Sequence, residues 1–188
     1  MNLDIKNLPY AHFERLGMSR KDVVTMSPQE LASMLKGGRT GLLPLKIELG
    51  KGVRPFQVEA KLSLSQNLDK TLSLEVHLIQ AKPTNTIDAT PEQWEKMLKG
   101  ELIVKNSKAH NGSIEPHIHQ LDRQTNEILT TRVNAIQLPH TIKDTVLTPE
   151  HKEQLKKGLA LELETRAQEP FIVRLDLNEA SGYVVILN

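Results

Sequence analysis

A motif that occurs three times constrains the fold of this chain most strongly. Each copy begins with Ser or Thr followed by Pro, and a Gly stands nine residues after that Pro. The copies start at Ser27-Pro28, Thr90-Pro91 and Thr148-Pro149. Ser and Thr cap helix N-termini, Pro suits the first helical position, and Gly accepts the positive φ that follows a helix. The motif therefore predicts three short helices, at about 28–36, 91–99 and 149–157.

An extended segment and a hairpin are predicted after each helix. The extended segments are 42–49, 102–105 and 159–164. The hairpins begin at Pro55, Pro116 and Pro170, where apolar and polar residues alternate, and each turns at a polar cluster. Such alternation is typical of antiparallel strands with one polar face. The sequence therefore predicts the α+β class: a helix–strand–hairpin unit in three copies, with antiparallel sheets each backed by a short helix.

Two parts are predicted from the pattern along the chain. Ahead of the first unit, residues 11–16 and a capping box of Ser19 with Asp22 indicate a small helical preface. The segment 81–89 has little hydrophobicity and contains a Pro. We therefore expect an N-terminal part, 1–82, holding the preface and the first unit, and a C-terminal part, 86–188, holding two further units.

Composition limits the core and several functions. The chain has three Phe, two Tyr and one Trp, so the core must be mostly aliphatic. Cys is absent, which excludes disulfides, thiolate catalysis and cysteine-ligated zinc. No apolar run is long enough to cross a membrane, so we expect a cytoplasmic protein with no membrane partner. The residues expected to face the sheets are Leu31, Leu35, Trp94, Met97, Leu98 and Leu155, with Val58, Leu62, Val173 and Leu175 opposite.

Three N-terminal segments resemble a known family. They are Asn7-Leu8-Pro9-Tyr10, Phe13-Glu14-Arg15-Leu16-Gly17 and Leu35-Lys36-Gly37-Gly38-Arg39-Thr40. The first part of the chain resembles one domain-of-unknown-function family, and the two Thr-Pro-Glu units resemble a second family that commonly follows it. Both are carried on conjugative and mobilisable elements of gut anaerobic bacteria, sometimes beside or fused to topoisomerase-like proteins. The resemblance implies a context in DNA mobility and supplies no catalytic residues.

A weak metal-site candidate is the pair His117 and His119. On a strand, residues i and i+2 point to the same face, and His110 is near enough in sequence to supply a third imidazole. No Asp or Glu stands at a supporting spacing, so solvated strand histidines are the favoured interpretation. Phosphate-loop and nucleophile-elbow motifs are also absent. We therefore expect no metal, no cofactor and no enzymatic activity.

Basic residues are concentrated near the first hairpin. Residues 1–85 carry a net charge of +4, whereas residues 86–188 carry −3. Arg, Lys and hydroxyl groups contact phosphates, although single-strand binders also need aromatic stacking residues, and only Phe56 is near. The basic stretch, residues 36–54, is therefore either a solvated face or a weak nucleic-acid patch. The candidate contacts are Lys36, Arg39, Thr40, Lys46, Lys51 and Arg54.

Two functions follow as hypotheses. The first is a non-catalytic accessory or interaction module of a mobile genetic element. Such a module would bind a protein partner or self-associate, through sheet edges or through the oppositely charged halves of the chain. The alternative is a DNA-binding accessory of conjugation or DNA-topology machinery that uses the local basic patch.

Overall fold

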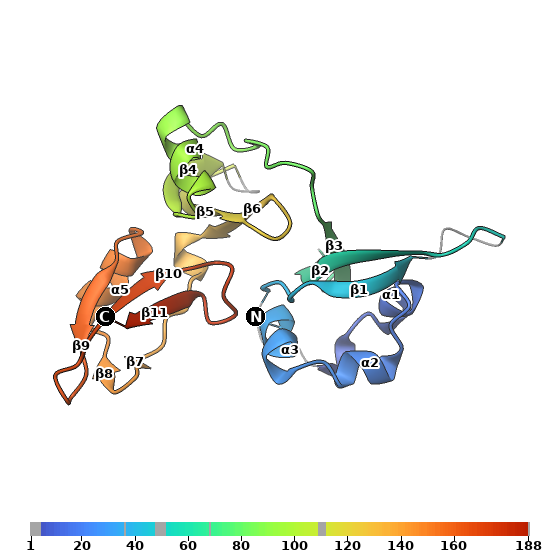
Figure 1. Cartoon of the computed structure of the whole chain (residues 1–188), viewed down its shortest axis with the longest axis horizontal. Coiled ribbons are helices and arrows are strands. Elements are labelled where there is room, and N and C mark those ends of the chain that lie inside the picture. The colour runs from blue at the N-terminus through green and yellow to red at the C-terminus, as the bar shows by residue number, and fades with distance from the viewer. Residues whose placement is uncertain (1–4, 36, 48–51, 68, 109–111, 188) are drawn as a thin grey trace. The chain divides into compact units, whose positions relative to one another are not determined.

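The computed structural model describes residues 5–35, 37–47, 52–67, 69–108 and 112–187. The chain forms two compact units, Met1–Ala81 and Lys82–Asn188. Both combine short helices with small antiparallel sheets, so the architecture is α+β (Figure 1).

The first unit has a helical N-terminal half followed by a sheet. Its helices are η1 (Ile5–Asn7), α1 (Tyr10–Arg15), α2 (Arg20–Val24) and α3 (Pro28–Leu35). Its strands are β1 (Leu43–Ile47), β2 (Phe56–Gln66) and β3 (Leu72–Leu78). They form an antiparallel sheet in the order β1-β2-β3, with the long β2 in the middle. The helical preface predicted ahead of the first unit is confirmed, including the capping box of Ser19 with Asp22.

One face of this sheet carries the core of the first unit. Alternate residues of β2 point to this face, and they include the buried Ala60 and Leu62. Each of the three α-helices contributes a fully buried side chain to the same cluster: Phe13, Val23 and Met34. The opposite face of the sheet is polar, which explains the alternating pattern of the strand sequence.

The second unit contains two three-stranded sheets. Its elements are α4 (Pro91–Leu98), β4 (Ile103–Lys108), β5 (Ile114–Asp122), β6 (Glu127–Arg132), η2 (Val133–Ala135), β7 (Thr141–Ile142), β8 (Thr145–Val146), α5 (Pro149–Lys156), β9 (Leu161–Glu164), β10 (Pro170–Leu175) and β11 (Tyr183–Leu187). The sheets have the orders β4-β5-β6 and β9-β10-β11. The short hairpin β7–β8 was not predicted.

Buried contacts join the two sheets of the second unit. Ile118 of β5 belongs to the same apolar cluster as Leu155, Phe171 and Val173. The buried amide of Gln120 also spans the two halves. Its Nε2 donates to the Gly100 carbonyl at 3.0 Å, and its Oε1 accepts from the Leu177 N–H at 2.6 Å. Both halves of the unit therefore contribute to one apolar cluster and are joined by the hydrogen bonds of Gln120.

The three predicted helices are confirmed, and their ends follow the predicted chemistry. Each begins at the Pro of the motif, and the Gly after each has a φ of +83° or +84°. In all three, two backbone N–H groups close the helix with a Schellman pattern, as in Gly37 to Met34 and Gly38 to Ser33. His151 completes its capping box through a long contact of 3.4 Å, consistent with its being a poor substitute for Glu or Gln.

Most of the expected core residues are buried or partly buried, but Leu98 is not. Leu98 is 49% exposed, whereas its neighbour Met97 is fully buried beside Ile103. Adjacent residues on a helix point about 100° apart, so this two-turn helix presents only a narrow stripe to the core. The prediction that Leu98 faces the sheet was therefore wrong.

Candidate functional site

The polar face of the first sheet carries two of the candidate phosphate contacts. Opposite residues of an antiparallel pair point to the same face. Lys46 is paired with Gln57, and Arg39 forms an isolated bridge with Ser63. Both partners alternate with core residues such as Leu62, so they lie on the polar face. Arg39 and Lys46 therefore share this face, about 20 Å apart along β2.

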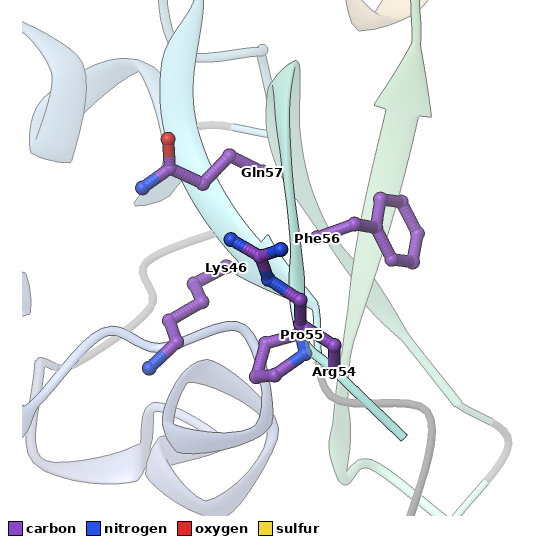
Figure 2. Close-up of a pocket in the computed structure, with 5 residues that line it drawn as sticks. All are labelled: Lys46, Arg54, Pro55, Phe56 and Gln57. Atoms are coloured by element: carbon purple, nitrogen blue, oxygen red, sulfur yellow. The ribbon is translucent and has the colours of Figure 1, made fainter.

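Lys46 and Arg54 line one shallow, open depression together with Pro55, Phe56 and Gln57. Figure 2 shows the ammonium, guanidinium and amide groups on one side of the strands, with the Phe56 ring pointing to the other side. The depression thus presents nitrogen donors from three side chains. This donor set suits an anion such as a phosphate group.

The remaining candidates in the basic stretch do not join this depression. Thr40 is only 3% exposed, and its hydroxyl accepts from the Leu62 N–H at 2.9 Å and donates to the Gly41 carbonyl at 2.8 Å. The Thr40 hydroxyl is therefore used in hydrogen bonds inside the first unit, beside β2, and is not available to a phosphate. Lys36 and Lys51 lie outside the described residues. Glu59 is on the same polar face, opposite Pro44, so the charge of that face is mixed.

His119 is buried, which corrects the expectation of a solvated strand histidine. Its side chain is 1% exposed on the face of β5 that packs toward α4, opposite Ile103. Its Nδ1 lies 2.9 Å from the Thr130 hydroxyl, and its Nε2 lies 3.4 Å from the Ser107 hydroxyl. The ring stacks on that of His117 with centroids 6.1 Å apart. Polar residues occupy both faces of β5 in this part of the sequence, so the pattern did not indicate that position 119 is in the core.

The environment of His119 keeps its imidazole neutral. Burial lowers the pKa of His119 to about 4, and the charges of His117 and Lys105 act in the same direction. Among the described residues, no group of three His, Cys, Asp or Glu side chains is arranged to hold a metal ion. His110, the suggested third ligand, lies outside the described residues. The contacts of His119 are those of a hydrogen-bonded core residue.

The open edge of β3 is a feature that the candidate residues did not include. Within the described ranges, β3 pairs with β2 on one side and with no strand on the other. Val76, Leu78 and Ile79 along this edge are 36%, 43% and 48% exposed. The alternation over 72–78 predicts the strand, but it does not show that the strand is an edge, because strand order does not follow from alternation.

The backbone of β3 presents hydrogen-bonding groups at this edge. The N–H of Leu62 bonds to the Thr40 hydroxyl and its C=O accepts from the Thr40 N–H, both on the β1 side of β2. Leu62 opposite Val76 is therefore a non-hydrogen-bonded pair. It follows that the N–H and C=O of Val76 point away from β2, toward the open edge.

Comparison with known proteins finds a similarity over the first part of the chain. The described residues include no helix that is long and apolar enough to cross a membrane. The chain matches no curated protein and no solved structure. Residues 3–88 match the family described as "Protein of unknown function (DUF4099)", which confirms the predicted resemblance to a family of unknown function for this part. Residues 3–88 include every element of the first unit from η1 to β3, so the similarity to this family covers the first unit.

Proposed function

We propose that this chain is a non-catalytic interaction module whose docking element is the open edge of β3. The observation that carries the proposal is the outward-pointing backbone of Val76, flanked by exposed apolar side chains. An open edge of this kind accepts a further strand: backbone hydrogen bonds supply affinity, and alternate side chains supply specificity. Proteins usually cover or shorten exposed edges, because they attract other chains.

The resemblance to families of mobile elements supports a narrower role. In this role, the module is a cytoplasmic accessory of a mobile genetic element, and its partner is another component of that element or the chain itself. The proposal also includes three copies of one unit, each with its sheet backed by its helix. The matched Pro starts, Gly ends and Schellman hydrogen bonds of α3, α4 and α5 support this internal duplication.

A photoreactive amino acid placed at position 76 tests the docking edge. The full chain is expressed in its native host and irradiated, and adducts are resolved by mass. The matched control places the same group at Asp69, an exposed residue in the turn between β2 and β3. We expect a discrete adduct from position 76 and none from position 69. Equal labelling at both positions, or no adduct at position 76, would contradict the proposal.

A second candidate function is binding of a nucleic-acid backbone, favoured by the depression that Lys46 and Arg54 line. The double variant Lys46→Glu/Arg54→Glu is expected to weaken DNA binding uniformly across sequences. It should also reduce the slope of log affinity against log salt by about one for each lost phosphate contact. Mobility shifts at several salt concentrations measure both effects.

The control for this prediction is the double variant Arg15→Glu/Lys96→Glu, which makes the same change of charge at exposed helical positions. It should leave the salt slope nearly unchanged if the depression is the site. Equal losses in both double variants would show that only net charge matters. Absence of binding by the wild-type chain at low salt would eliminate this second function.

A further inference from the structure

We propose that the open edge of β3 binds β3 of a second copy of this chain, antiparallel, with Val76 at the two-fold axis. The two three-stranded sheets would then form one continuous six-stranded sheet. This inference rests on the proposed function of the β3 edge and names its partner. Isologous pairing of this kind is the commonest symmetry among homodimers.

The hydrogen-bond pattern limits which residues can face each other across the axis. Even-numbered residues of β2 bond toward the β1 side, as Leu62 does with Thr40. Consistent with this parity, the Lys46 N–H on β1 points away from β2 and donates to the Leu16 carbonyl at 3.0 Å. On β3, it follows that Leu74, Val76 and Leu78 direct their N–H and C=O groups outward. In an antiparallel pair, these residues must lie opposite one another.

Side-chain pairing selects one register among those that the hydrogen bonds allow. With Val76 at the axis, Glu75 lies opposite His77 of the second copy, and His77 lies opposite Glu75. With Glu75 at the axis, the two carboxylates would face each other directly, which is unfavourable. With His77 at the axis, fewer strand residues would be paired. The register centred on Val76 is therefore the one that places each Glu75 opposite the imidazole of His77.

The same register also aligns the apolar side chains. Leu74 lies opposite Leu78 of the second copy twice, and Val76 lies opposite itself, all on the face of the sheet that carries the core. Val76 and Leu78 are 36% and 43% exposed in the single chain, so pairing would cover apolar surface that is now in contact with water. By contrast, the edge strand β11 (Tyr183–Leu187) contains no charged residue that would select a register.

Light scattering of the purified full chain over a concentration series tests the proposal. We expect a mass that rises from one copy to two as the concentration increases. Val76→Pro removes an N–H that points outward and bonds nothing on β2, so a folded monomer is expected. The control is Glu59→Lys, which is exposed on the middle strand and away from the edge, and this variant should dimerise normally.

A charge exchange tests the register itself. His77→Glu places like charges opposite each other twice and should raise the dimer Kd about tenfold. The double variant Glu75→His/His77→Glu restores the pairing of a carboxylate with an imidazole and should return the Kd to near the wild-type value. Both variants lose the hydrogen bond between His77 and the Ser63 hydroxyl. The difference between their dimer Kd values therefore reports only the pairing of residues 75 and 77 across the axis.

The outcomes separate this inference from the proposed function. A wild-type chain that remains monomeric at every concentration, or a dimer that Val76→Pro leaves intact, would overturn β3 self-pairing. If the adduct at position 76 then contains a different protein, the docking edge stands and only its occupant is corrected. If position 76 gives no adduct of any kind, both proposals fail.

Discussion

Replacing Phe171 with Ala is expected to lower the free energy of unfolding of the second unit by about 3–5 kcal/mol. The Phe171 side chain is 1% exposed and packs in one cluster with Leu155, Leu163 and Val173. Removing the ring leaves a cavity that its β-strand and helical neighbours can fill only in part, because their backbones are fixed by the sheet and by α5.

Hydrogen exchange measures the loss in the unit that carries each substitution, at the amides of α5 and β9–β11 for Phe171 and at those of β1–β3 for Phe56. The matched control is Phe56→Ala, which removes the same ring from a side chain that is 41% exposed. Its cost should be within about 1 kcal/mol, since little apolar burial is lost. Equal destabilisation by the two substitutions would show that burial of the Phe171 ring contributes no more stability than an exposed ring does.

Local signals made the helices the most predictable part of this fold. Pro at the first helical position, a capping Ser or Thr, and Gly after the last turn act within a few residues of each helix end. The residues that determine where each helix begins and ends are therefore all close together in the sequence. The helices starting at Pro28, Pro91 and Pro149 appear where expected. The hairpin β7–β8 has strands of two residues each, too short to give a periodic pattern.

Positions that depend on distant contacts were not predictable in the same way. Leu98 is apolar and was assigned to the core, but Met97 occupies the only stripe of α4 that reaches the sheet. His119 is polar and was assigned to solvent, yet it is buried with hydroxyl partners from the two strands beside it. In both cases the deciding contact comes from a residue of another element, so the local pattern was not sufficient.

The residues of the candidate basic patch differ in how well their positions could be predicted, for a similar reason. Lys46 lies in β1 and Arg54 comes two residues before β2, so the antiparallel pairing of β1 with β2 brings both residues to the same end of the sheet. Thr40 differs because its hydroxyl bonds to Leu62, which is 22 residues away. That β3 is an open edge depends on the strand order of the sheet. Which of its residues point their N–H and C=O groups outward was inferred from the distant contact between Thr40 and Leu62. Sequence patterns indicate the strand, whereas its role as an edge emerges only from the assembled sheet.

Acidification is expected to destabilise the second unit through His119, between about pH 6.5 and pH 4. In the folded chain, burial lowers the pKa of His119 to about 4 from an ordinary value of 6.5, and His117 and Lys105 add to this effect. Well above pH 6.5 the imidazole is neutral in both the folded and the unfolded chain, so it does not lower the free energy of unfolding. As the pH falls, the unfolded chain binds the proton first, so the free energy of unfolding decreases. Below about pH 4 both states are protonated and the loss is complete, at about 3 kcal/mol.

Urea denaturation of wild type and His119→Gln at pH 7, 5.5 and 4 measures this contribution. Gln keeps a polar group that can bond to the Ser107 and Thr130 hydroxyls but does not titrate, so the variant should lose most of the pH dependence. The control His140→Gln removes an exposed histidine from the same unit and should keep the wild-type dependence. Identical pH profiles for wild type and His119→Gln would mean that the buried imidazole accepts a proton in the fold without penalty. Since the nearest charges, those of His117 and Lys105, are also positive, that result would require the sheet to open around His119 as the pH falls.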